Sequence, residues 1–506
     1  MKKIFFFLLV VLGVALLCLL SGRVFPYTFD SMIYISTAEN IHRGQGMLCW
    51  NFLVEGPTQE YFPAFLQPPG YPILIAFLML FGLDGYTAGL LVPRLCFLIL
   101  PFLFYSIFKR MMPSSQAMIG SFVCTFMFPA VKCSMMAWSD IPCLCFSLMA
   151  LLAVFYVIEK GHKAASSLVF LSGLLAGYVF LIRFVGICLI GCIVLGFIVC
   201  WILNLLSKKD FFRIITIYAG GISLVIVPFL FRNWCVFGTI QPCFIPPSQT
   251  PLAGNIKDFL GSIAMMLWAE PSMMGLAAFL IIAAVVFIVK KSREMIEREM
   301  IEVDKKVFVF TIVLTAYFLV NSIFLIIFQT LRFSAEKIND RYLIQVAWIM
   351  MIAVVLAADI ATGLLKRSKN LKRAHVAFIL LSMFIVVQML LGKDFLKGQE
   401  KTLASSKSIE RYVLILRKVP KDNMIITNFP DLVYYHVQRN VRMLSHYTPY
   451  DLVKLAASQK KFVIFLVKGE KNSHGDWGKY SFQWVDPVGY TKIFSDQQVD
   501  LLVPKI

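Results

Sequence analysis

Several ionisable side chains stand at the edges of long apolar segments in this sequence. Asp30 follows the first apolar run, Asp140 opens a later one, and Arg183, Arg232 and Arg341 lie at the ends of others. An ionisable group at membrane depth is costly, so each is by default a hypothesis about function. A carboxylate can take up a proton, and an arginine fork can bind phosphate or carboxylate groups. The chemistry predicted for this chain is therefore proton transfer and anion binding.

Apolar helices must position these groups, because 59% of the 506 residues are hydrophobic and only 15% are charged. A helix needs about twenty residues to cross the hydrocarbon of a bilayer. The stretch 71 to 83 is too short and suits an interfacial or re-entrant helix. We predict eleven transmembrane spans, near residues 4 to 20, 88 to 108, 114 to 131, 139 to 158, 165 to 182, 184 to 206, 211 to 231, 272 to 289, 307 to 328, 342 to 364 and 374 to 391.

Lys and Arg clusters alternate with these spans in a way that predicts orientation. Cytoplasmic loops are rich in basic residues, and with eleven spans the clusters at 2 to 3, 109 to 110, 290 to 306 and 366 to 373 all fall on one side. The N-terminus is then cytoplasmic and the C-terminus extracytoplasmic in a multi-pass cell-membrane protein. The net charge of +19 is interpreted as this bias, so no nucleic-acid partner is predicted.

The predicted fold class is an α-helical polytopic membrane protein with a small C-terminal α/β soluble domain. Residues 1–391 form the transmembrane domain, with 21–87 as its first outer loop and juxtamembrane helices, and residues 392–506 form the extracytoplasmic domain. Short β-type runs occur at 424 to 428, 461 to 467, 492 to 495 and 500 to 503, with helical patterns at 430 to 438 and 449 to 457. This domain has no phosphate-binding glycine motif.

Metal and disulfide chemistry are weakly indicated. The 12 cysteines include no CxxC pair, and they are interpreted as packing residues, although Cys235 and Cys243 share an outer loop and could form a bridge. His42 and Glu60 could bind a divalent metal, but a lone surface histidine usually has no such role. No cofactor is assigned.

The order and spacing of several motifs resemble the GT-C membrane glycosyltransferases, in the branch related to protein O-mannosyltransferases and the aminoarabinose transferase of lipid A. A carboxylate follows the first span, and later motifs recur in order along most of the chain. The motifs are Asp30, Tyr34, Ala38, Gly44 and Gly46, then PPGYP at 68 to 72, Ser139-Asp140, GLLAGYVFLIRFVG at 173 to 186, FRNWCVFGT at 231 to 239 and DRYL at 340 to 343.

The resemblance implies transfer of a sugar, with inversion, from a polyprenyl-phosphate donor to a glycan, lipid or protein acceptor at the outer face of the membrane. Asp30 would be the general base, and Arg341, Tyr342 and Arg232 would bind the donor phosphate. No metal ligand is assigned. The expected partners of the protein are the donor, the acceptor and membrane lipids. Further candidates for the substrate cavity are Tyr34, Glu39, Glu60, Gln67, Asp140, Arg183, Asn233 and Asp340.

Other interpretations of these residues stay open. Asp30 could be a helix N-cap, and Asp140 could cap the helix whose first turn holds Pro142. Arg183 could snorkel, cap a helix or pair with Asp140. Some relatives carry a second carboxylate where Ser31 stands, and the aminoarabinose branch carries a lysine where Gln67 stands, which argues against that branch. A transporter or lipid-linked sugar flippase is the alternative function, although no paired halves are evident.

Overall fold

The protein is described by a computed structural model, which divides into two compact units. The helical unit comprises Met1–Ser21, Phe65–Leu74 and Leu90–Phe395, and the mixed unit comprises Gly22–Ala64, Ile75–Gly89 and Leu396–Ile506. The predicted domain limits, 1–391 and 392–506, stay a prediction. The structure describes residues 2–50, 61–64, 66–242, 250–268, 272, 275, 302–331, 338–351, 373–420, 423–428, 430–437, 441–443, 462–467, 490–495 and 499–504.

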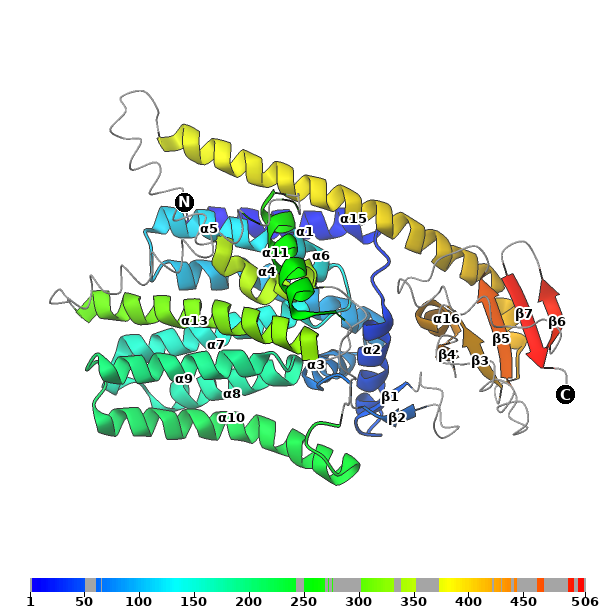
Figure 1. Cartoon of the computed structure of the whole chain (residues 1–506), viewed down its shortest axis with the longest axis horizontal. Coiled ribbons are helices and arrows are strands. Elements are labelled where there is room, and N and C mark those ends of the chain that lie inside the picture. The colour runs from blue at the N-terminus through cyan, green and yellow to red at the C-terminus, as the bar shows by residue number, and fades with distance from the viewer. Residues whose placement is uncertain are drawn as a thin grey trace. The chain divides into compact units, whose positions relative to one another are not determined.

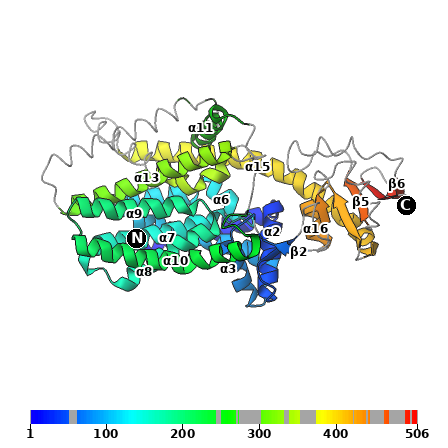
Figure 2. The ribbon, with the colours of Figure 1, turned by 60° about the horizontal axis from the view of Figure 1, so that its bottom comes forward.

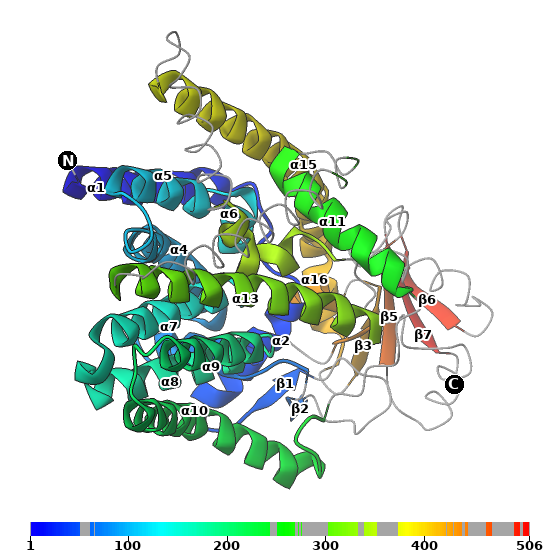
Figure 3. The same ribbon diagram turned by 60° about the vertical axis from the view of Figure 1, so that its left-hand side comes forward.

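Apolar helices build the helical unit, and three of them, α3, α4 and α15, continue into the mixed unit. Figure 1 and Figure 3 show α7, α8, α9, α10 and α13 packed side by side. The helices are α1 (Lys2–Ser21), α3 (Gly70–Met79), α4 (Gly85–Phe108), α5 (Ser114–Thr125), α6 (Phe128–Ser134), α7 (Asp140–Lys160), α8 (Ser166–Ile182), α9 (Gly186–Ile202), α10 (Lys208–Phe237), α11 (Leu252–Trp268), α13 (Glu302–Leu331) and α15 (Arg373–Lys418), with a short 3-10 turn at Gly161–Lys163 and a further helical segment at 340–351.

Among the described residues, α4, α7, α10 and α13 are long and apolar enough to cross a membrane. Helices α5 and α6 form a fifth span if the pair, which bends by 52°, is counted as one. Helix α3 has only 10 residues, in keeping with the prediction that this stretch does not span. The multi-pass architecture is confirmed, whereas the number of eleven spans stays a prediction. The predicted span 272–289 lies almost wholly outside the described residues.

Helices α8 and α10 approach each other through glycine. A Cβ on Gly173 would lie 3.2 Å from the Cα of Gly221, and a Cβ on Gly221 would lie 2.8 Å from the amide nitrogen of Leu174. The neighbouring Gly220 has no atom within 4 Å of such a position. Small residues let two transmembrane backbones approach closely, and here they set the distance between α8 and α10.

The mixed unit begins with α2 (Phe29–His42) and a hairpin of β1 (Leu48–Trp50) and β2 (Tyr61–Pro63), in which Trp50 pairs with Tyr61. Side chains of α2 hold β1 in place. The hydroxyl of Ser36 accepts a hydrogen bond from the Trp50 amide (3.0 Å), and the amide of Asn40 donates to the Leu48 carbonyl (3.1 Å). Nine of the 14 residues of α2 are buried, so its buried polar side chains need partners of this kind.

A five-stranded sheet forms the rest of this unit in the order β4-β3-β5-β7-β6. Strand β3 pairs in parallel with β4 and β5, and β7 pairs antiparallel with β5 and β6. Helix α16 (Pro430–Val437) lies between the sheet and α2 (Figure 2). The strands are β3 (Met424–Thr427), β4 (Val441–Met443), β5 (Phe462–Val467), β6 (Tyr490–Ser495) and β7 (Val499–Pro504).

The C-terminal α/β prediction is thus confirmed, because all four predicted strands and the helix at 430 to 438 are present. Strand β4 was not predicted, since three residues carry too little alternation to identify a strand. The helix predicted at 449 to 457 lies outside the described residues.

Replacing Gly221 by alanine should force α8 and α10 apart and lower the thermal unfolding temperature of the purified protein in detergent. Gly220→Ala is the matched control, because in open space alanine stabilises a helix by about 1 kcal/mol relative to glycine. The unfolding temperature of Gly220→Ala should therefore be unchanged or raised. Equal unfolding temperatures for the two variants would contradict this account of α8 and α10.

Candidate functional site

A buried carboxylate joins three helical segments of the helical unit. Asp140 is 1% exposed and opens α7 directly after the cap residue Ser139. Its Oδ1 accepts a hydrogen bond from the guanidinium of Arg183 (2.6 Å), and its Oδ2 accepts one from Nε of Arg341 (3.0 Å). The pair of Asp140 with Arg183 was one of the alternatives open from the sequence, whereas the bond to Arg341 was not anticipated.

Local backbone structure brings these groups together. Asp140 lies in the first turn of α7, where the helix dipole favours a negative charge. Arg183 ends α8 in an extended conformation (φ −150°, ψ 134°). Arg341 opens the segment 340–351, where its amide donates to Oδ1 of Asn339 (3.0 Å). All three residues therefore stand at helix ends.

Further contacts restrain the arginine at 341. Its guanidinium lies over the ring of Trp138, 4.1 Å from the centroid. One turn further on, the side-chain amide of Gln345 donates to the backbone carbonyl of Asp140 (2.9 Å), and Gln345 is 2% exposed. A cation over an indole face is attracted by the ring quadrupole, more strongly when desolvated. Arg341 is thus held on two sides, by a carboxylate and by an aromatic face.

A second ion pair adjoins the first. The ammonium of Lys132, in α6, lies 3.0 Å from Oδ1 of Asp340. The buried thiol of Cys133 is within electrostatic range of Lys132, Asp140, Asp340 and Arg341. We call the five side chains Lys132, Asp140, Arg183, Asp340 and Arg341 the charge cluster.

Three cations and two carboxylates make up the charge cluster, so it carries one surplus positive charge. Sequence reasoning missed Lys132, which directly follows the predicted span 114 to 131. The signal was present, because a lysine stands there in an otherwise apolar run. A buried surplus of positive charge attracts anions more strongly than the same charge in water.

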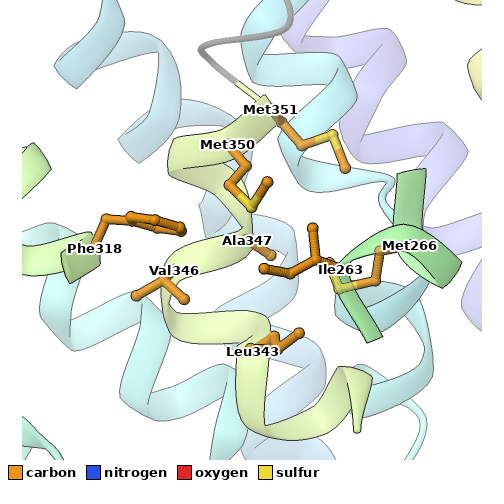
Figure 4. A pocket seen from close by; sticks show the side chains of 8 residues that line it. All are labelled: Ile263, Met266, Phe318, Leu343, Val346, Ala347, Met350 and Met351. Atoms are coloured by element: carbon orange, nitrogen blue, oxygen red, sulfur yellow. The ribbon is translucent and has the colours of Figure 1, made fainter. Parts of the chain in front are cut away.

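An apolar pocket lies further along the helical segment that carries Arg341. It is a small pocket between α11, α13 and this segment. Figure 4 shows side chains from α11 facing those of the segment, with Phe318 of α13 at one side. The lining residues are Ile263, Met266, Phe318, Leu343, Val346, Ala347, Met350 and Met351. Unbranched methionine side chains can adapt to a flexible apolar ligand.

Asp30 lies in the mixed unit, in the first turn of α2, and is partly exposed. The interpretation of Asp30 as the helix N-cap is wrong. Thr28 is the cap residue, and its backbone N–H donates to the hydroxyl of Ser31 (3.0 Å). The terminus of α2 is satisfied by a capping box. Tyr34, one turn along from Asp30, is 1% exposed.

Glu39 is the other acidic residue of α2. Burial raises the pKa of Glu39, the Arg43 guanidinium at 3.8 Å lowers it in part, and the Asp84 carboxylate raises it again. Ionised Glu39 is therefore less favourable in the folded protein than in the unfolded chain. The free energy of unfolding falls as the pH rises from the ordinary pKa of this carboxyl group to its raised pKa. Among the described residues, no group of three or more metal-ligating side chains occurs. Glu60 lies outside them.

Four further predicted residues, Gln67, Arg232, Asn233 and Tyr342, lie in the helical unit. Arg232 donates to Oδ1 of its neighbour Asn233 (3.0 Å) and lies over the ring of Phe237. Asn233 is buried and donates to the carbonyl of Ile240 (3.2 Å). Gln67 and Tyr342 are half-buried. Cys235 is an exposed free thiol, and Cys243 lies outside the described residues.

Comparison with known proteins gives one family match and several structural ones. Residues 66–231 match the family model described as dolichyl-phosphate-mannose-protein mannosyltransferase. The oligosaccharyltransferase AglB from Archaeoglobus fulgidus, solved with an inhibitory peptide and a dolichol-phosphate, superposes with a TM-score of 0.58 at 10% identity, covering 92% of this chain and 70% of that one. Among curated proteins, none has a matching sequence.

The chain has the GT-C fold. The superposition on AglB carries this statement of fold, and the family model adds a sequence match over residues 66–231. ArnT from Cupriavidus metallidurans, solved with undecaprenyl phosphate, aligns over 98% of this chain and 97% of that one, with 14% identity and a TM-score of 0.49. The matched residues 66–231 of this GT-C chain include Asp140 and Arg183, whereas Asp30 and Arg341 lie beyond them.

Substituting Asp140 by asparagine should destabilise this GT-C protein more than substituting Asp340. Asp140→Asn leaves two guanidinium groups facing a neutral amide in a buried site, which should cost about 3 kcal/mol. Asp340→Asn removes the ion pair with Lys132, whose two side chains are 18% and 19% exposed, and should lower the free energy of unfolding by about 1 kcal/mol. Thermal unfolding in detergent measures the difference. Equal losses would show that Asp140 is not the main charge partner of the arginines.

Proposed function

We propose that this protein transfers a sugar from a polyprenyl-phosphate-linked donor to an acceptor hydroxyl at the outer face of the membrane, with inversion. The single observation that carries the proposal is the charge cluster, in which Arg341 is held by Asp140 and by the ring of Trp138. The GT-C fold and the match to the mannosyltransferase family model support the reaction class. The acceptor could be a glycan, a lipid or a protein.

The charge cluster suits a lipid-linked phosphate for two reasons. Arg341 presents a planar fork that matches phosphate oxygens, and its orientation is already restrained by Asp140 and Trp138. The second reason is that the apolar side chains which line the small pocket begin two residues further along the same helical segment, at Leu343. A cationic group and an apolar surface thus follow each other on one helical segment, as an anionic head with a hydrocarbon chain requires.

The reaction that we propose needs one proton acceptor and one leaving group. The acceptor oxygen attacks the anomeric carbon, the bond from that carbon to the phosphate oxygen breaks, and the proton of the acceptor hydroxyl passes to Asp30. The electron pair leaves with the polyprenyl phosphate, whose charge the arginine forks stabilise. Thr28 and Ser31, rather than Asp30, form the capping box of α2, and Asp30 lies in the first turn of this helix.

Orientation of the chain supports the outer face as the place of reaction. The basic clusters of the sequence favour a cytoplasmic N-terminus and an outer C-terminal α/β domain. Nucleotide sugars are absent outside the cytoplasm, so a donor that reaches this face must be attached to lipid. On this assignment, Arg341 and Asp140 would stand at the outer ends of their helices.

Substitution of Asp30 by asparagine should abolish the proton acceptor while keeping the size of the side chain. Membranes containing the variant, supplied with polyprenyl-phosphate sugars, should transfer sugar about 10²- to 10⁴-fold more slowly than wild type, because a general base contributes a factor of that size. Asp394→Asn, an exposed carboxylate on α15, is the matched control and should retain full activity. Full transfer by Asp30→Asn would remove Asp30 from the catalytic role.

A further inference from the structure

Trp50 contacts both the early and the late part of the chain within the mixed unit. Its side chain is 0% exposed and stacks on Tyr434 of α16, with ring centroids 4.3 Å apart. Its indole N–H donates to the carbonyl of Val441 in β4 (2.9 Å). On the α2 side, the same ring meets the edge of Phe29 at 6.0 Å. Phe29 directly precedes Asp30, so Trp50 lies between the C-terminal sheet region and the first turn of α2.

The neighbouring tyrosine of α16 contacts the chain just before α2. Tyr435 stacks on Tyr27 (centroids 5.0 Å apart) and meets Phe25 and Tyr86 edge to face, at 5.4 Å and 5.1 Å. The amide of Phe25 also donates to the side chain of Gln399 in α15 (3.0 Å). Tyr435 thus contacts residues that precede α2, whereas Tyr434 contacts Trp50, which in turn contacts the first residue of α2.

These contacts restrain the backbone that carries Asp30. Aromatic pairs contribute about 0.5–1.5 kcal/mol each beyond the area that they bury, and α16 makes several of them with one stretch of chain. Burial raises the pKa of Tyr434 well above its ordinary value, so the stacked phenol stays neutral. Helix α16 belongs to the C-terminal region, whose first described strand is β3, whereas α2 belongs to the first outer loop.

We propose that Tyr434 and Tyr435 are positioning residues, through which the C-terminal α/β region holds the carboxylate of Asp30 in its productive place. This inference rests on the proposed function, in which Asp30 is the general base. Tyr434 acts through Trp50 and Phe29, and Tyr435 acts through Phe25 and Tyr27. A displacement of about 1 Å at a reacting group can reduce a rate about 10²-fold. Loss of these contacts should therefore change the reaction rate by a measurable amount.

The test compares Tyr434→Ala with Tyr434→Phe in the full-length protein, using sugar transfer from a polyprenyl-phosphate donor in membranes. Tyr434→Ala removes the stacked ring and should lower kcat about tenfold or more, while KM for the donor changes less than about twofold. Tyr434→Phe keeps the ring and should restore kcat to within about twofold of wild type. Leu414→Ala, a 72% exposed position on α15, is the control for a change in the same unit.

Elution as a single species and the thermal unfolding temperature show whether each variant is folded. If Tyr434→Ala does not fold, Trp50→Phe and Tyr435→Leu take its place, because each weakens one set of contacts and keeps an apolar side chain; both should show the same fall in kcat with little change in KM.

Three results would overturn the inference, and they are distinguishable. Wild-type kcat in a folded Tyr434→Ala variant, when Asp30→Asn is inactive, would contradict the positioning role alone. Full activity of Asp30→Asn would contradict the assignment of the base and with it the positioning role. A loss of kcat that Tyr434→Phe does not restore would also contradict the inference, because the stacked ring would then not be what matters.

Discussion

The carboxylate of Asp140, shared between Arg183 and Arg341, is the interaction on which the helical unit depends. It ties the start of α7 to the end of α8 and to the segment 340–351, whose arginine is 201 residues away in sequence. Two guanidinium groups cannot lie near each other in an apolar setting without an anion between them, since desolvation and repulsion both oppose it. The carboxylate permits the arrangement yet leaves the charge cluster with a positive surplus.

The charge cluster links structure to the proposed chemistry. Its arginines are oriented by Asp140 and, for Arg341, by the ring of Trp138, and electrostatic attraction between such cations and a phosphate is stronger where water is partly excluded. Asp30, the proposed base, belongs to the mixed unit, at the start of a helix whose Ser36 and Asn40 side chains are hydrogen-bonded to β1.

Prediction from the sequence succeeded where the signal was local. Apolar length identified the helices, β-branched runs identified β3 and β5, and Asp140 and Arg183 stand at the ends of consecutive helices whose pairing can be anticipated. It failed for contacts between distant segments. The bond from Trp50 to Val441 spans 391 residues, and no periodicity indicates which strand the indole meets. Lys132 was missed because it lies in α6, after the 52° bend between α5 and α6, and the sequence does not indicate that this bend occurs or that Lys132 pairs with Asp340.

The central claim, that the charge cluster binds the phosphate of a polyprenyl donor, is tested most directly by ligand-induced thermal stabilisation in detergent. At a hundredfold excess over Kd, polyprenyl phosphate should stabilise wild type by about 2.7 kcal/mol. Neutral polyprenol of the same length should stabilise it much less, and Arg341→Gln should lose the difference between the two ligands. Asp30→Asn should keep it. Equal stabilisation by phosphate and alcohol, or an undiminished phosphate effect in a folded Arg341→Gln variant, would contradict the account.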